Sequence, residues 1–229
     1  MNYMANIIET ETTFFFQPAT IDSSFFYQPS TMVLIWIVIF TSDWLMNYIG
    51  ARLYHNRVRS FWLFEKGYYL KSISEDEIRK PSKLIMRFFS ELVISSTGIW
   101  ILLYSCRLMS SWNIYEFFCG TFVLLEACIH FRHVRNVALF SLATKGSGLY
   151  GCIAIPKWIT LRNSFTEFAI FSLSYLLIYF FDTRNYFVLG GVISCFLVSV
   201  YNLIIAETEK KIFIQKNQNS IRELNVQAQ

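Results

Sequence analysis

The chain has 229 residues, of which 54% are hydrophobic, 18% aromatic and only 16% charged, against roughly 25% charged residues in a soluble domain. Together with a mean hydropathy of +0.39, this composition excludes a disordered chain, a disulfide-stapled secreted module and a nucleic-acid-binding protein with a basic face. We therefore expect an integral membrane protein whose net charge of +4 reports topology rather than acidic partners or nucleic acid.

The apolar stretches predict the fold class. A helix that crosses about 30 Å of hydrocarbon needs roughly 20 largely apolar residues, because every backbone polar group must be hydrogen-bonded within its own segment. Five stretches meet this condition, so we expect an all-α bundle of five transmembrane helices. The predicted spans are about 31–51, 84–105, 113–133, 164–181 and 187–206. They make up a membrane domain, 31–206, between an aromatic N-terminal tail, 1–30, and a polar C-terminal tail, 207–229.

The distribution of Lys and Arg predicts the orientation. The first predicted loop carries eight of them, the third loop and its borders five, and the C-terminal tail four, whereas Arg107 and Arg184 are the two on the other side. Positively charged residues resist translocation, so we expect the N-terminus outside and the C-terminus in the cytosol. The expected location is the cell (inner) membrane, with the lipid bilayer as the main partner.

Three acidic residues lie inside the predicted spans, where an ionisable group costs roughly 2.5 to 3.5 kcal/mol. They are Asp43 in the first span, Glu91 in the second and Glu126 in the third. Because neighbouring spans run in opposite directions and a helix rises about 1.5 Å per residue, all three fall in one layer about 10 to 12 Å from the cytosolic boundary.

Each acid has a polar neighbour one turn closer to the cytosol: Asn47 at i+4 from Asp43, Arg87 at i−4 from Glu91 and His130 at i+4 from Glu126. The remaining predicted members of the set are His133, Glu167 and Asn202. These nine residues predict a polar pocket in the cytosolic half of the bundle.

Three functions are compatible with such a pocket. Carboxylates joined by an imidazole suit the binding or conduction of a proton, a cation or a small polar ligand, with His130 and His133 as relay or ligands. The alternative is a non-catalytic subunit or scaffold, whose acids satisfy one another and whose basic cytosolic loops recruit a membrane partner or a second copy of the chain. The third is a metal-dependent membrane hydrolase.

For the hydrolase, Glu126, His130 and His133 would hold a divalent metal that activates water. Their spacing does not match the H-E-x-x-H pattern, because the two histidines are three residues apart. The sequence contains no Gly-x-Ser-x-Gly and no P-loop, so we assign no catalytic residue and favour a protein that is not an enzyme.

The first cytosolic loop also carries an aromatic segment among basic residues. We expect this segment to lie in the membrane plane against anionic lipid headgroups, or to bind a partner protein. Its aromatic residues are Phe61, Trp62, Phe64, Tyr68 and Tyr69. In the third loop, glycines at 146–151 formally match G-x-G-x-x-G but do not follow a strand or open a helix, so we expect a turn leading into an extended segment at 152–156.

Overall fold

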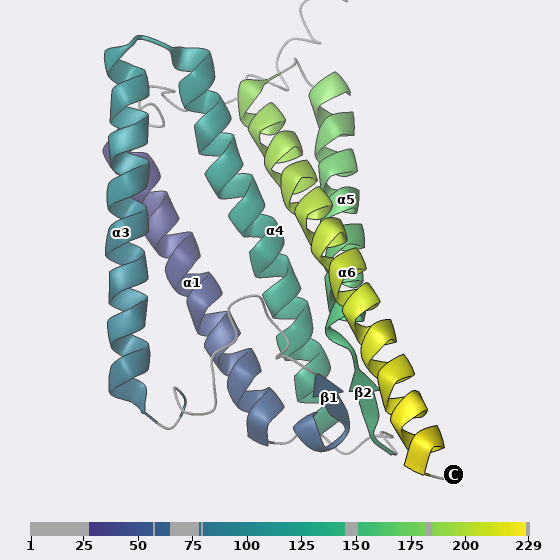
Figure 1. Ribbon diagram of the computed structural model, residues 1–229. Helices are drawn as coiled ribbons and strands as arrows, with labels where there is room; N and C mark the ends of the chain where they lie inside the picture. The colour runs from purple at the N-terminus through teal and green to yellow at the C-terminus, as the bar shows by residue number, and fades with distance from the viewer. Residues whose placement is uncertain are drawn as a thin grey trace, which may run out of the picture.

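The computed structural model describes residues 28–56, 58–64, 78, 80–144, 151–181 and 185–227. The predicted N-terminal tail up to residue 27 lies outside these residues, as do Tyr68 and Tyr69. The elements in chain order are α1 (Pro29–Asn56), η2 (Val58–Ser60), β1 (Trp62–Phe64), α3 (Pro81–Leu108), α4 (Trp112–Thr144), β2 (Ile153–Ile155), α5 (Lys157–Phe181) and α6 (Tyr186–Gln227) (Figure 1).

Five of these helices are long and apolar enough to cross a membrane by length and composition, which confirms the predicted number of apolar helices. The helices are longer than the predicted spans. The largest differences are at the ends of α4 and α6, which continue past the predicted limits of 133 and 206 to Thr144 and Gln227. Hydropathy falls where polar residues begin, whereas backbone hydrogen bonding continues through them, so apolar windows locate a span but not the end of its helix.

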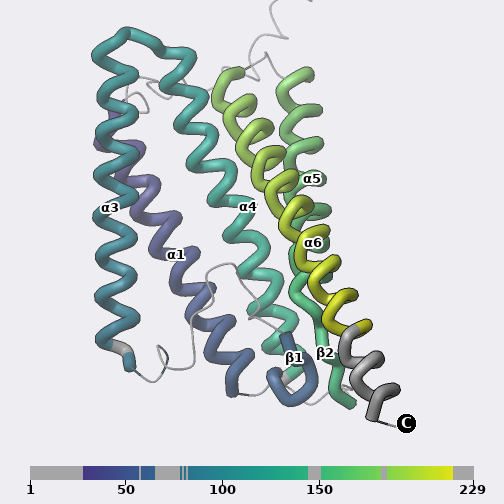
Figure 2. Tube along the Cα trace, viewed as in Figure 1, coloured from purple at the N-terminus to yellow at the C-terminus, as the bar shows by residue number. Residues whose placement is uncertain are grey.

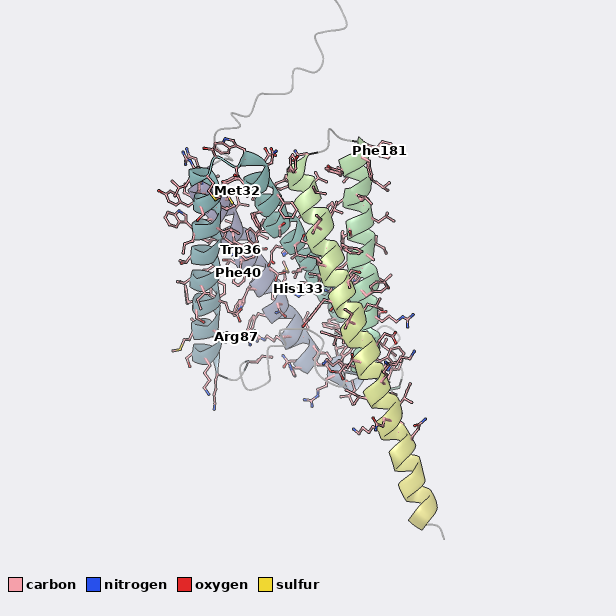
Figure 3. All side chains as sticks on the ribbon, turned by 45° about the horizontal axis from the view of Figure 1, so that its top comes forward. Met32, Trp36, Phe40, Arg87, His133 and Phe181 are labelled. Carbon is pink, nitrogen blue, oxygen red and sulfur yellow. The ribbon has the colours of Figure 1, made fainter. Side chains whose placement is uncertain are left out.

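The helices pack as a chain of neighbours. α5 lies along α6, α6 along α4 and α4 along α1, while α3 packs against α1 and α4 (Figures 1 and 2). α3 stands at one edge of the bundle, and α1 and α4 lean away from it toward the end that carries the two strands (Figure 1). We call this end, at residues 62–64 and 153–155, the sheet end. α6 continues well past the other helices beyond it (Figure 3).

Glycines set the close approach of α4 and α6. A Cβ atom on Gly120 would lie 1.7 Å from the carbonyl oxygen of Phe187, and one on Gly190 would lie 2.0 Å from the carbonyl oxygen of Phe117. No side chain fits at either position, so the two backbones meet directly, as small residues permit between membrane helices. This contact fixes the rotation of α4 relative to α6.

The end of the bundle opposite the strands is packed with apolar side chains. Its buried cluster comprises Met32, Ile99, Leu103, Cys106, Tyr115 and Cys119. One turn farther along α1, the Trp36 indole Nε1 donates a hydrogen bond of 3.1 Å to the Ser95 hydroxyl of α3. Met32, Trp36 and Phe40 follow one another along α1 from this apolar end toward the middle of the bundle (Figure 3).

Part of the aromatic segment of the first loop forms a short strand. β1 pairs in parallel with β2, and Trp62, Leu63 and Phe64 lie opposite Ile153, Ala154 and Ile155. Trp62 and Phe64 are partly buried against a cluster that contains Tyr54, Val58 and Phe140. Trp62 and Phe64 therefore pack on the bundle, and such aromatic side chains suit a pleated, half-buried surface. The extended segment expected at 152–156 forms β2.

Candidate ligand site between the helices

A cavity of about 640 Å³ lies between α1, α3, α4 and α6, with Phe168 contributed by α5. Its volume falls in the range typical of sites for small organic molecules. Six acidic or basic side chains line it: Asp43, Arg87, Glu91, Glu126, Arg132 and His133. The cavity is therefore lined by charged side chains although it lies between apolar helices.

Six of the nine predicted pocket residues line this cavity. They are Asp43, Asn47, Arg87, Glu91, Glu126 and His133. The other three, His130, Glu167 and Asn202, are not among the lining residues. The depth calculation from the sequence could select the correct layer, but the rotation of each helix decides which side chains of that layer face the cavity.

The cavity is elongated along the helix axes. Its lining on α1 runs from Trp36 to Asn47, and its lining on α3 runs from Leu84 to Ser95. Each interval covers eleven residue steps, which corresponds to about 16 Å at the rise of an α-helix. The agreement between the two antiparallel helices indicates one continuous space rather than two separate pockets.

Asp43 is held by histidine. Its Oδ1 lies 2.7 Å from Nδ1 of His133, and the bond is buried. When Asp43 is ionised its carboxylate can only accept, and Nδ1 of His133 is then the donor of this bond. Nδ1 of His130 lies 3.8 Å from the same oxygen, beyond hydrogen-bond distance. The Asp43–His133 bond joins α1 to α4 at the wall of the cavity.

A second acid is paired along its own helix. Arg87 Nε lies 3.1 Å from Glu91 Oε1, the i, i+4 arrangement that the spacing suggested. Both side chains are about one-third exposed, so the pair contributes more to the charge pattern of the cavity than to stability. Arg87 is the internal counter-charge of α3.

Asn47 differs from these paired groups. It is 8% exposed and lines the cavity, yet its Oδ1 has no hydrogen-bond partner among the described residues. A buried amide oxygen without a donor costs roughly 1 to 3 kcal/mol, and buried polar atoms of native proteins almost always have a partner from the protein, water or a ligand. The cavity therefore offers an acceptor to an incoming N–H or O–H group.

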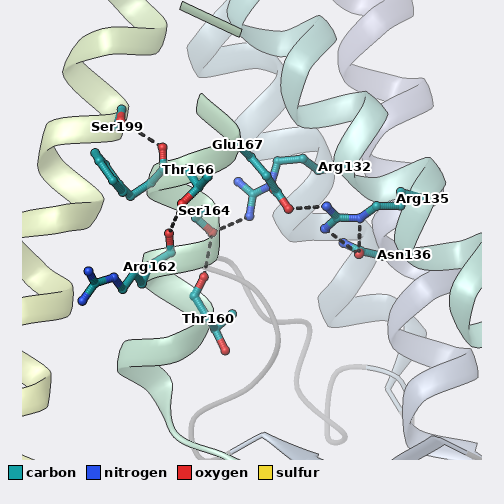
Figure 4. A network of polar contacts seen from close by, with 10 residues as sticks. Arg132, Arg135, Asn136, Thr160, Arg162, Ser164, Thr166, Glu167 and Ser199 are labelled. Atoms are coloured by element: carbon teal, nitrogen blue, oxygen red, sulfur yellow. Dashed lines mark hydrogen bonds and ion pairs between the residues drawn. The ribbon is translucent and has the colours of Figure 1, made fainter. Parts of the chain in front are cut away.

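Glu167 serves a different role from the predicted one (Figure 4). Its Oε2 lies 2.8 Å from Arg132 Nε, and its Oε1 accepts from Arg135. Arg132 also donates a hydrogen bond of 2.7 Å to the Ser164 hydroxyl and lies 5.0 Å from the ring centroid of Phe168. Glu167 thus joins α5 to α4 outside the cavity lining.

Arg132 is a lining residue that the sequence analysis missed. It lies next to residue 133, where the third span was expected to end, but α4 continues to Thr144. The aromatic wall was also missed, although Trp36, Phe40 and Trp44 recur at four-residue intervals on α1 and so share one helix face. That spacing was the available signal.

Asn202 is fully buried, and neither its Oδ1 nor its Nδ2 has a hydrogen-bond partner among the described residues. Its neighbour along the same face of α6, Ser199, donates to the carbonyl of Phe165 at 3.0 Å. Ser199 thus lies at the contact between α5 and α6, and the buried Asn202 is not among the residues that line the cavity.

In the described part of the chain, no group of three or more His, Cys, Asp or Glu side chains is placed to hold a metal ion. The geometry therefore gives no support to a site formed by Glu126, His130 and His133. No protein-family model, curated protein or solved structure matches this chain.

Proposed function

We propose that this chain is an integral protein of the cell (inner) membrane, with its N-terminus outside and its sheet end and C-terminus in the cytosol. The distribution of positive charge supports this orientation. Among the described residues, Arg107 is the only Lys or Arg at the end of the bundle opposite the strands. The cavity then lies in the cytosolic half of the membrane.

We further propose that the cavity binds a small organic cation that carries N–H donors. One observation carries this proposal: three carboxylates from three different helices, Asp43, Glu91 and Glu126, line the same cavity. Ionisable residues within membrane helices commonly mark ligand or ion pathways, because their insertion is costly.

The charge balance favours a cation over an anion. Apart from His133, the lining contains three carboxylates and two guanidinium groups, and one of these guanidinium groups, on Arg132, is paired with Glu167 outside the lining. The aromatic rings of Trp36, Phe40 and Trp44 add surfaces that attract cations electrostatically. A volume of about 640 Å³ is much larger than a bare ion needs and suits an organic molecule.

The test is a thermal-stability comparison of purified protein with n-butylammonium, n-butanol and butyrate, which share a chain but differ in charge. At a concentration ten times the dissociation constant, binding to the folded state stabilises it by about 1.4 kcal/mol, or about 3 to 6 °C for a chain of this size. We expect this shift with butylammonium alone. Glu126→Gln should reduce it, whereas Glu116→Gln, on the same helix but outside the lining, should not.

The scaffold remains a second candidate, because Asp43 bonds His133 and Glu91 bonds Arg87 without any ligand. In that case the polar groups serve to hold the helices together. The scaffold predicts that no butyl compound changes the melting temperature and that Glu126→Gln lowers it. A folded Glu126→Gln variant with unchanged stability and a reduced response to butylammonium contradicts the scaffold.

A further inference from the structure

We propose that the ligand is an amphiphile, with a primary ammonium head held in the cavity and a hydrocarbon chain that leaves sideways between α3 and α6. This inference rests on the proposed function and adds to it the class of the ligand and its route. It combines three observations: the exposure of the cavity rim, the polarity gradient along the cavity and the unpartnered acceptor on Asn47.

The rim is exposed at the side of the bundle. Ile94 of α3 and Tyr201 of α6 both line the cavity, yet they are 72% and 58% exposed. α3 packs against α1 and α4, and α6 packs against α4 and α5, so α4 stands between these two rim helices (Figure 1). Residues that line a cavity and are also exposed on the bundle surface mark its opening, which therefore faces lipid and not the aqueous ends of the helices.

Polarity changes along the cavity. Asn47 and Asp43 lie toward the sheet end of α1, followed by Phe40 and then Trp36 toward the middle of the bundle. On α3, which runs in the opposite direction, Leu84 and Arg87 lie nearest the sheet end, and Glu91, Ile94 and Ser95 follow away from it. A head group bound at the polar end would leave its chain against aromatic and aliphatic side chains.

This gradient has the direction of a lipid in the cytosolic leaflet. In the proposed orientation, the polar end of the cavity lies nearest the cytosol and the apolar end nearest the bilayer centre. An amphiphile of that leaflet could therefore move sideways through the opening without turning over and without taking its chain through water. A water-soluble ligand would gain nothing from an opening on the lipid-facing side.

The acceptors define the head group. Oδ1 of Asn47 is buried and has no donor among the described residues, and the neighbouring carboxylates accept hydrogen bonds as well. A primary ammonium supplies three N–H donors and a positive charge, whereas a quaternary ammonium supplies charge without donors. We therefore expect a primary ammonium to bind more tightly than its trimethylated analogue, by about tenfold or more for one hydrogen bond to a charged group.

The test uses tryptophan fluorescence in lipid nanodiscs, with dodecylammonium that carries bromine on its terminal carbon as the quenching probe. Terminally brominated dodecanol and dodecyltrimethylammonium are the matched controls. The reporter is Ile94→Trp, at the opening, in a chain that keeps its native tryptophans, and the quenching of the parent chain is subtracted. Ile101→Trp in the same background is the control, because Ile101 lies two turns away on α3, is also exposed and does not line the cavity.

We expect the brominated ammonium to quench the Ile94→Trp reporter saturably. The brominated alcohol should quench it without saturation, as a probe dissolved in the surrounding lipid does. The trimethylated probe should bind at least about tenfold more weakly than the primary ammonium. The Ile101→Trp reporter should respond equally to all three probes. Equal quenching at both positions by all probes would overturn the amphiphile proposal. If butylammonium still stabilises the protein in that case, the cation site stands and its ligand is water-soluble; if it does not, both proposals fail.

Discussion

Asn47→Leu separates a ligand site from a structural polar residue, because the two roles predict opposite changes in stability. The side chain of Asn47 is 92% buried and its Oδ1 is unpartnered among the described residues. Removing a buried acceptor without a donor relieves a desolvation cost of about 1 to 3 kcal/mol, while leucine has a similar size and remains compatible with the aromatic wall. We expect the ligand-free variant to be more stable than wild type by about 1 kcal/mol or more.

The same substitution should weaken ligand binding. A hydrogen bond between an amide oxygen and an ammonium contributes about 1.5 to 3 kcal/mol, which corresponds to about tenfold or more in affinity. The assay is a melting curve of ligand-free protein together with a butylammonium titration of wild type and variant. A variant that melts lower than wild type and binds butylammonium with unchanged affinity would refute the reasoning.

Asn136→Leu is the matched control for this experiment. Asn136 is also on the buried side of its helix, at 1% exposure, but its Oδ1 accepts hydrogen bonds from Arg135 at 3.1 and 3.3 Å. Its replacement leaves the guanidinium with fewer acceptors, so we expect a loss of stability. Because Asn136 does not line the cavity, the affinity for butylammonium should be unchanged.

Three further substitutions test the packing and the ion pairs by thermal unfolding. Gly120→Ala should unfold the protein or lower its melting temperature strongly, because its Cβ would lie 1.7 Å from a carbonyl oxygen of α6. The control Gly98→Ala meets no atom within 4 Å and should stabilise α3 by up to about 1 kcal/mol. Equal effects of the two substitutions would contradict the close contact between α4 and α6. Glu167→Gln should lower the free energy of unfolding by about 2 kcal/mol, because two arginines lose a charged acceptor. Glu207→Gln, whose ion pair is half exposed at 3.6 Å, should lower it by less than about 1 kcal/mol. A larger loss for Glu207→Gln than for Glu167→Gln would contradict the pairing of Glu167 with the two arginines. Asp43→Asn weakens a buried charge-assisted bond of 2.7 Å and should cost about 1 to 2 kcal/mol, and no change in melting temperature would contradict that bond.

The sequence was sufficient to predict the five apolar helices and the common level of the three acids along the helix axes, because both follow from helix geometry. Span length depends on composition alone, and a rise of about 1.5 Å per residue converts position into depth. Asp43, Glu91 and Glu126 consequently share one cavity in the structure, as their common depth suggested. These properties do not depend on how the helices pack.

Helix rotation could not be predicted in the same way. The contact of α4 with α6 depends on Gly120 and Gly190, which act together only in three dimensions. Glu167 of α5 likewise pairs with two arginines of α4 and does not line the cavity, which its position in the sequence does not reveal. The parallel pairing of β1 with β2 was equally inaccessible, because each strand has only three residues and its partner lies in a distant part of the chain.

The most direct measurement is equilibrium dialysis of radiolabelled n-butylammonium against the purified protein, with wild type, Glu126→Gln and Glu116→Gln side by side. The cation site predicts saturable binding by wild type and Glu116→Gln at one ligand per chain, and clearly weaker binding by Glu126→Gln. Binding that does not saturate, or that is the same in all three folded proteins, would contradict a site formed by the carboxylates of the cavity.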